Sequence, residues 1–210
     1  MNRRQFLKFS ALTAATGIIC SYPVFIERYA VQVNIYKISL PTLPQQFNVF
    51  TIVHLTDLHY GPLVQLFFIR YIIGITNSLK KDVTVYTGDY VHKRNTDEEI
   101  NVVWPVLSEL RAPCGVFSVL GNHDHWADSN RSAYWLERSG QNIRNSTYCF
   151  EREGKRLWIA GGGDLWEDHK NFDSILMNIP EEDCRIVLAD PAAKTLRSQN
   201  PKLNVLQAQY

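Results

Sequence analysis

The sequence lacks the charge imbalance that is typical of proteins that bind nucleic acid. Its 22 lysines and arginines stand against 21 aspartates and glutamates, which gives a formal net charge of +1. No basic stripe interleaved with aromatic residues occurs along the chain. These absences exclude an electrostatic footprint for nucleic acid, so we expect no nucleic-acid partner.

Paired cysteines are missing as well. The four cysteines (Cys20, Cys114, Cys149 and Cys184) are scattered, and no two of them form a C-x-x-C pair. This spacing indicates neither a zinc site nor a disulfide framework, and mostly buried apolar thiols are the expected state. One bridge from Cys114 to Cys149 or Cys184 stays open as an alternative if the chain is exported.

The sequence has no internal repeat and no low-complexity tract. Its 210 residues, 45% hydrophobic and 20% charged, are enough for one domain of ordinary size with a real core. We divide the chain into an N-terminal signal or anchor (1–26), a connector with an edge strand at 31–36 (27–48), and a main domain (49–210).

The N-terminus has the order of an export signal. Arg3 and Arg4 form a twin-arginine pattern with Phe6-Leu7-Lys8, and an uncharged, moderately apolar run follows from Phe9 to Tyr22. No A-x-A cleavage site follows, and the uncharged run continues to Ile26, close to the lower limit for a membrane span. We therefore expect the twin-arginine export machinery as a partner and the periplasm or cell envelope as the location, with an uncleaved membrane anchor as an alternative. A basic N-terminal helix is the remaining interpretation.

Strands and helices alternate through the main domain, which predicts an α/β fold. Apolar runs rich in β-branched residues predict strands at 49–55, 83–86, 115–120 and 185–189, and helical spacing predicts helices at 63–79, 96–110, 132–138 and 172–178. Residues 147–152 and 156–160 flank a glycine turn and predict a hairpin that adds a second, mixed sheet, followed by a flexible glycine turn at 161–164.

Three polar clusters follow three of these strands, each about thirty residues after the last. They are Asp57-Leu58-His59, Gly88-Asp89, and Gly121-Asn122-His123-Asp124. Ligands of open α/β sheets bind at the carboxyl ends of strands, so we expect these clusters to share one site. Each cluster taken singly has an ordinary interpretation as a turn. The order and spacing of the three clusters are what favours a shared site.

The donor types predict a site for divalent cations. Carboxylates of Asp57 and Asp89, the His59 imidazole and the Asn122 amide suit Mn²⁺, Fe or Zn²⁺. Two cations about 3.5–4 Å apart can clamp a phosphate and lower the pKa of a bound water to about 7. His123 is placed to protonate a leaving oxygen or to stabilise charge on the phosphate.

Asp124 is expected to orient the His123 ring, as a carboxylate orients a catalytic imidazole. The other histidines receive ordinary interpretations. His54 is expected as a hydrogen-bonded core residue, and His92 and His125 as surface or outer residues.

These motifs resemble the calcineurin-like metallophosphoesterase superfamily, whose ordered signature is D-x-H, G-D-x and G-N-H-[DE]. The resemblance is closest to bacterial phosphodiesterases with a twin-arginine signal. It rests on the twin arginines and on residues 54–61, 88–91, 121–124 and 163–166.

The resemblance implies a four-layer αββα sandwich with two divalent metal ions held between loops. Asp57 and His59 then hold the first metal, Asp89 bridges, Asn122 holds the second and His123 is the acid. The implied substrates are phosphoesters. Some relatives cleave the pyrophosphate of UDP-2,3-diacylglucosamine in lipid A synthesis, and a membrane-directed N-terminus is compatible with such a lipid-linked substrate.

The sequence departs from the family pattern near its end. The family has L-A-H-N-P where this chain reads Leu188-Ala189-Asp190-Pro191, and the family's later G-H-x-H-G-G has no counterpart after the approach at 200–206. By resemblance the second metal loses two ligands and the first loses one, and the second sheet is incomplete. The resemblance thus implies a C-terminally truncated or frameshifted member; Asp190 as a substitute ligand is the less favoured alternative.

Three hypotheses follow for function. The first is an exported or membrane-anchored di-metal phosphoesterase that hydrolyses phosphoester or pyrophosphate bonds. The second is a non-catalytic remnant that binds one metal or a phosphate. The third is a purely structural α/β protein of the envelope.

Overall fold

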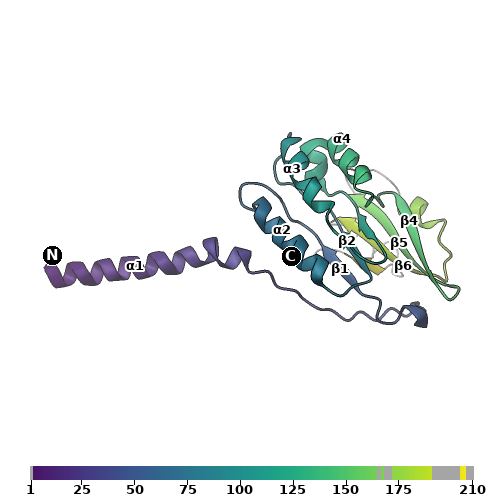
Figure 1. The fold of residues 1–210 in the computed structure, drawn as a ribbon, viewed down its shortest axis with the longest axis horizontal. Coiled ribbons are helices and arrows are strands. Elements are labelled where there is room, and N and C mark those ends of the chain that lie inside the picture. Colours follow the sequence, from purple (N-terminus) through teal and green to yellow (C-terminus); the bar gives the residue numbers. More distant parts are fainter. Residues whose placement is uncertain (1, 165–166, 168–171, 191–203, 207–210) are drawn as a thin grey trace. The chain divides into compact units, whose positions relative to one another are not determined.

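The structure, a computed structural model, describes residues 2–164, 167, 172–190 and 204–206. Two compact units make up the chain, Met1–Lys37 and Ile38–Tyr210. Figure 1 shows the elements of both units. Each unit is described by itself.

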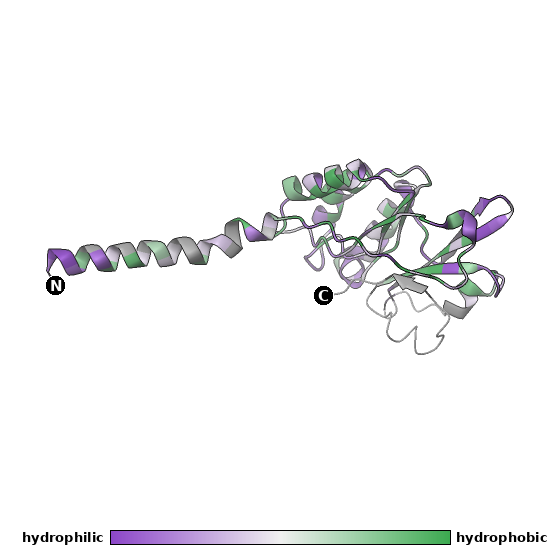
Figure 2. Cartoon of the chain, turned by 90° about the horizontal axis from the view of Figure 1, so that it is seen from below, coloured by the Kyte–Doolittle hydropathy of each residue, from purple (hydrophilic) through white to green (hydrophobic). Residues whose placement is uncertain are grey.

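The N-terminal unit consists of helix α1 (Arg3–Phe25), the short 3-10 helix η1 (Glu27–Tyr29) and an extended segment. A capping box begins α1, in which the Asn2 side chain accepts from the Gln5 N–H and the Gln5 side chain accepts from the Asn2 N–H. Its first turn is hydrophilic, and the turns that follow mix apolar and polar residues (Figure 2). Among the described helices, none combines the length and the apolarity needed to span a membrane. The export signal and the anchor stay predictions.

The edge strand predicted at 31–36 is wrong. These residues form no strand, and the side chains of Ile35 and Tyr36 are 86% and 77% exposed. Alternation of apolar and polar residues indicates a strand only where a neighbouring strand offers hydrogen bonds and a face to cover, and this segment has neither.

The first sheet has three parallel strands in the order β1 (Ile52–Leu55), β2 (Val83–Tyr86), β3 (Val116–Ser118). Helix α2 (Leu66–Ser78) connects β1 to β2, and α3 (Glu98–Leu107) connects β2 to β3. All five elements lie within or close to the predicted ranges, which confirms the α/β class. Because the strands are parallel, their carboxyl ends meet at one edge of the sheet.

Helix α4 (Asn122–Arg138) differs from the prediction, which placed a loop before a helix at 132. The helix begins directly after Gly121 and is broken at Asp128, whose φ of −164° and ψ of 104° are not helical. Polar, weakly helix-forming residues masked the first half in the sequence. The G-N-H-D motif therefore forms the N-terminal turn of a helix.

The second sheet has the order β4 (Ser146–Arg152), β5 (Lys155–Asp164), β6 (Cys184–Asp190), β7 (Asn204–Leu206). Strands β4 and β5 form the predicted hairpin, and the other pairs are parallel. The flexible turn predicted at 161–164 is wrong, because β5 runs through Asp164 with a shift of register between Gly161 and Gly163. Gly161 instead allows the backbone at Ile143 to lie close to β5, since a Cβ at position 161 would lie 2.3 Å from the Ile143 carbonyl oxygen.

Two further short helices complete the described elements, η2 (Gln45–Phe47) and α5 (Phe172–Leu176). Buried apolar side chains form three clusters: between α2, α3, α4 and the first sheet, between the two sheets, and between α5 and the second sheet. The departures predicted at 191 and 200–203, and the last residues 207–210, lie outside the described residues. An incomplete second sheet stays a prediction.

The structure confirms the prediction that His54 is a hydrogen-bonded histidine of the core. It lies in β1 with its Nε2 2.9 Å from the hydroxyl oxygen of Thr87. Burial lowers the pKa of His54 to about 4, although the charge of Asp57 acts in the opposite direction.

We expect His54 to make the metal-free fold sensitive to acid. Unfolded histidine has a pKa of about 6.5, so the unfolded chain takes up a proton that the folded chain does not, and the unfolding free energy falls by up to about 3 kcal/mol as pH drops from 6.5 toward 4. Denaturant unfolding in a chelator at pH 7 and about pH 4.5 measures this loss. His54→Gln should lose less over the same interval, and an equal loss would contradict the assignment.

Candidate metal centre

The loops after β1 and β2 are joined by backbone hydrogen bonds. The Asp57 N–H donates to the Gly88 carbonyl over 3.2 Å, and the His59 N–H donates to the Asp89 carbonyl over 3.0 Å. These bonds bring the D-x-H and G-D motifs side by side, as their places at the ends of neighbouring parallel strands predicted.

Three of the residues predicted as metal ligands have left-handed backbones. Asp57, His59 and Asp89 have φ values of 54°, 47° and 59°. Non-glycine residues rarely adopt this region, and each such residue costs on the order of 1–3 kcal/mol. Strained backbone conformations that cluster in one place are typical of functional sites, where the chemistry and not the packing determines the geometry.

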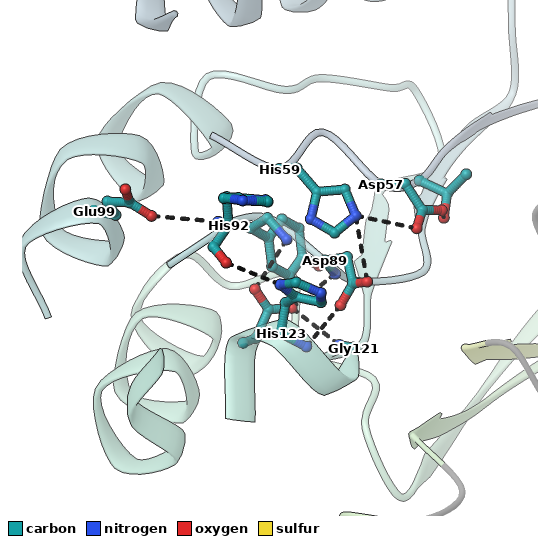
Figure 3. A network of polar contacts seen from close by, with 10 residues as sticks. Asp57, His59, Asp89, His92, Glu99, Gly121 and His123 are labelled. Carbon is teal, nitrogen blue, oxygen red and sulfur yellow. Dashed lines mark hydrogen bonds and ion pairs between the residues drawn. The ribbon is translucent and has the colours of Figure 1, made fainter. Parts of the chain in front are cut away.

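The side chains of these residues converge (Figure 3). The His59 Nε2 lies 3.6 Å from an oxygen of Asp57 and 3.6 Å from an oxygen of Asp89. Ligand atoms of the three residues all lie within 4.8 Å of one another. A separation of 3.6 Å exceeds that of a hydrogen bond but is close to the spacing of about 3–3.5 Å between two donors that share one cation at about 2.1 Å.

The charges of the centre favour an added cation. Interaction with the Asp57 carboxylate, above all, raises the pKa of His59. Burial raises the pKa of Asp89, while the N–H of His123 and the charge of His59 lower it. Two carboxylates lie close together at this centre, and a divalent cation would balance their charge.

His123 lies at the start of α4, directly beside this group. Its N–H donates to an Asp89 oxygen over 2.9 Å, and its ring centre is 4.6 Å from that of His59. The ring Nδ1 lies 3.0 Å from the His92 carbonyl oxygen. A carbonyl only accepts, so Nδ1 carries the hydrogen of this contact, and Nε2 is the ring nitrogen that the contact does not use. Asn122 precedes His123 as the first, partly buried residue of α4.

Asp124 has a different role from the predicted one. Its buried carboxylate accepts the backbone N–H groups of Gly121, Asp89 and Tyr90, each over 2.9 Å. Burial, followed by the charge of Asp89, raises its pKa to about 7, while the N–H bonds oppose that rise. The carboxylate therefore fastens the G-D loop to the start of α4, and the His92 carbonyl, rather than Asp124, orients the His123 ring.

His92 was predicted as a surface or outer residue, and the structure adds it to the centre. It is exposed, but His59, His92 and His123 form a second group of donors within 4.8 Å of one another. Glu99 of α3 holds the loop by accepting the N–H of Lys93 over 2.9 Å and that of His92 over 3.3 Å (Figure 3). The signal for His92 was its place three residues after Asp89, across the buried pair Tyr90-Val91.

The remaining histidine lies farther along α4. The His125 Nδ1 is 3.0 Å from the Ser129 hydroxyl oxygen, within the same helix. Two carboxylates and up to three imidazoles make up the centre, and this donor set fits divalent Mn, Fe or Zn. Asp57, His59 and Asp89 are the residues that would hold a cation, and His92 and His123 lie beside His59.

The sequence model of the calcineurin-like phosphoesterase family matches residues 50–207, about three quarters of the chain. The chain therefore belongs to the calcineurin-like phosphoesterase family, and by this membership it is a metallophosphoesterase hydrolase.

Relatives found by sequence similarity are also metallophosphoesterases or phosphodiesterases by name, or cleave a pyrophosphate by name. The chain is 27% identical over 215 residues to the uncharacterized metallophosphoesterase YkuE of Bacillus subtilis, covering 98% of this chain and 74% of that protein. It is 26% identical to the phosphodiesterase YaeI of Escherichia coli, with 96% and 74% covered. It is 31% identical to the UDP-2,3-diacylglucosamine pyrophosphatase LpxG of Chlamydia trachomatis, with 92% and 59% covered.

Solved structures support the fold. The protein TT1561 of Thermus thermophilus superposes with a TM-score of 0.54 at 14% identity, covering 77% of this chain and 82% of that one. The NAD nucleotidase NadN of Haemophilus influenzae superposes with a TM-score of 0.52 at 10% identity, covering 76% of this chain and 38% of that one.

We expect Gly88→Ala to disrupt the centre. Gly88 has a φ of 98°, and a Cβ there would lie 2.2 Å from the backbone nitrogen of Gly121. Backbone cannot yield as a side chain can, so the variant should lose at least about 2 kcal/mol of unfolding free energy and much of its metal affinity. Denaturant unfolding and calorimetry with Mn²⁺ measure both quantities.

The matched control is Gly74→Ala in α2, where an added Cβ meets no atom within 4 Å. A helical Gly→Ala change without a clash should be neutral or stabilise by up to about 1 kcal/mol. Equal stability of the Gly88 and Gly74 variants would contradict the close contact between the G-D loop and Gly121.

Proposed function

We propose that the chain hydrolyses phosphodiesters or pyrophosphate diesters with two divalent cations. The observation that carries this proposal is the convergence of Asp57, His59 and Asp89, each in a strained backbone conformation, at the carboxyl ends of parallel strands. Strain at all three donors indicates that the fold maintains this geometry for chemistry.

In this proposal each ligand has a separate task. Asp57 and His59 would hold the first cation, Asp89 would serve both cations, and Asn122 would contribute its amide oxygen to the second. When bound, the cations supply charge that stabilises the phosphate in the transition state and a water of lowered pKa.

His123 is the proposed acid. Its Nδ1 is occupied at the His92 carbonyl, so the proton for the leaving oxygen comes from Nε2. Its backbone N–H, bound to Asp89, ties the position of the acid to that of the bridging ligand. The hydrogen bond therefore fixes the distance between the group that protonates the leaving oxygen and the residue that would hold the cations.

The proposed setting is the cell envelope. It is supported by the twin arginines at positions 3 and 4 and by likeness to LpxG, which is named as a UDP-2,3-diacylglucosamine pyrophosphatase. A substrate of that type, presented at a membrane, suits a chain that is exported to the envelope.

One observation favours a second candidate function. The sequence has Asp190, where the resemblance to the family implies a histidine, and the loss of that ligand would weaken the second cation site. A chain with one strong site could bind a metal or a phosphate without turnover.

Asp89→Asn should abolish metal-dependent hydrolysis of bis-p-nitrophenyl phosphate. An amide cannot bridge two cations with two charged oxygens, so kcat/KM should fall by on the order of 10³ or more. Asp97→Asn, which alters an exposed carboxylate that caps no N–H of α3, is the matched control and should keep full activity. If the wild type shows no turnover above the Asp89 variant, the catalytic proposal is wrong.

Calorimetric titration with Mn²⁺ separates the two candidate functions. The catalytic proposal predicts two equivalents bound by the wild type and a loss of both on Asp89→Asn, because a bridging ligand serves both sites. One equivalent without turnover would instead support the non-catalytic function.

A further inference from the structure

An exposed cation, Arg94, lies at the edge of the metal centre. It belongs to the segment between β2 and α3, two residues after His92. Its guanidinium carbon is 3.8 Å from the centre of the Trp126 ring. The Trp126 ring centre is in turn 5.0 Å from that of His123. A single indole therefore separates Arg94 from the proposed acid.

The backbone beside Arg94 is fastened to the helix that carries His123. The Asn95 N–H donates to the Trp126 carbonyl over 2.9 Å, and the Thr96 N–H donates to the Ala127 carbonyl over 3.0 Å. The break in α4 follows directly at Asp128, so these carbonyls accept from outside the helix. Asn95 itself has a φ of 52°. A broken helix and a strained residue thus keep the Arg94 segment against Trp126.

Trp126 is held at its edge as well as at its face. Its Nε1–H donates to a Glu167 carboxylate oxygen over 2.9 Å, and the Glu167 N–H donates to Asp164 over 2.7 Å. The orientation of the indole is therefore fixed, and its Nε1–H already donates to Glu167. Trp126 acts as a positioning residue for Arg94.

Stacking leaves the hydrogen-bonding edge of Arg94 available. A guanidinium that lies over an indole keeps its N–H donors in the plane, pointing away from the ring. No carboxylate in the described part of the chain forms an ion pair with Arg94. Its planar fork matches the oxygens of a phosphate.

We propose that Arg94 binds a second phosphate in the leaving group of the substrate and so makes the centre selective for pyrophosphate diesters. This inference rests on the proposed function. The leaving side is indicated because His123, which protonates the leaving oxygen, lies between Arg94 and His59 in the chain of ring contacts.

The step balances as hydrolysis. A water oxygen bonds to one phosphorus while the bond from that phosphorus to the bridging oxygen breaks, and the water releases one proton to solvent, from which His123 is protonated again after turnover. The bridging oxygen takes the proton of His123. It leaves with the second phosphate, whose charge Arg94 neutralises.

Binding of uridine diphosphate and uridine monophosphate to the Mn²⁺-loaded full chain tests the proposal without turnover. The two probes differ only in the second phosphate. The wild type should prefer the diphosphate, and Arg94→Gln should lose roughly tenfold in diphosphate affinity, as expected for a charge-assisted hydrogen bond, with monophosphate affinity changed by less than about twofold. Isothermal calorimetry measures all four affinities.

Arg138→Gln is the matched control, because Arg138, at the end of α4, is also an exposed arginine beside a tryptophan, 5.9 Å from the Trp135 ring. It should keep the wild-type preference. No diphosphate preference in the wild type, or the same preference in Arg94→Gln, would overturn the proposal. Loss of the preference in Arg94→Gln together with an absence of turnover would support the role of Arg94 and count only against catalysis.

Discussion

The buried carboxylate of Asp124 is the interaction on which the rest of the centre depends. It accepts N–H groups from its own helix start at Gly121 and from Asp89 and Tyr90 in the loop after β2. Hydrogen bonds to a charged acceptor contribute about 1.5–3 kcal/mol each. The loop after β1 is bonded in turn to the loop after β2. Three segments far apart in the sequence are thus held at one point.

This fastening explains how strained ligands persist. Asp57, His59 and Asp89 would each relax from a positive φ in an unconstrained loop, at a gain on the order of 1–3 kcal/mol. The hydrogen bonds between the loops oppose that relaxation. The result is a rigid set of carboxylates and imidazoles, which are the donors that hold divalent cations in a metallophosphoesterase.

Much of the fold and part of the site could be predicted from the sequence. The strands of the first sheet were predictable because buried parallel strands are continuous apolar runs. The motifs at their ends predicted that Asp57, His59, Asp89 and His123 lie close together, as they do in the structure. The role of Asp124 and the membership of His92 were not predictable, because both depend on backbone groups of distant loops. The start of α4 was missed because tertiary bonds at Asp124, not helix propensity, initiate it.

The central claim is that the ends of β1 and β2 and the start of α4 deliver donors to a shared cation. Crystals of the chain grown with Mn²⁺, measured at the manganese absorption edge, test it most directly. The account predicts an anomalous peak within about 2.0–2.3 Å of Asp57, His59 and Asp89 ligand atoms. A peak bound elsewhere, or none at this centre, would contradict it.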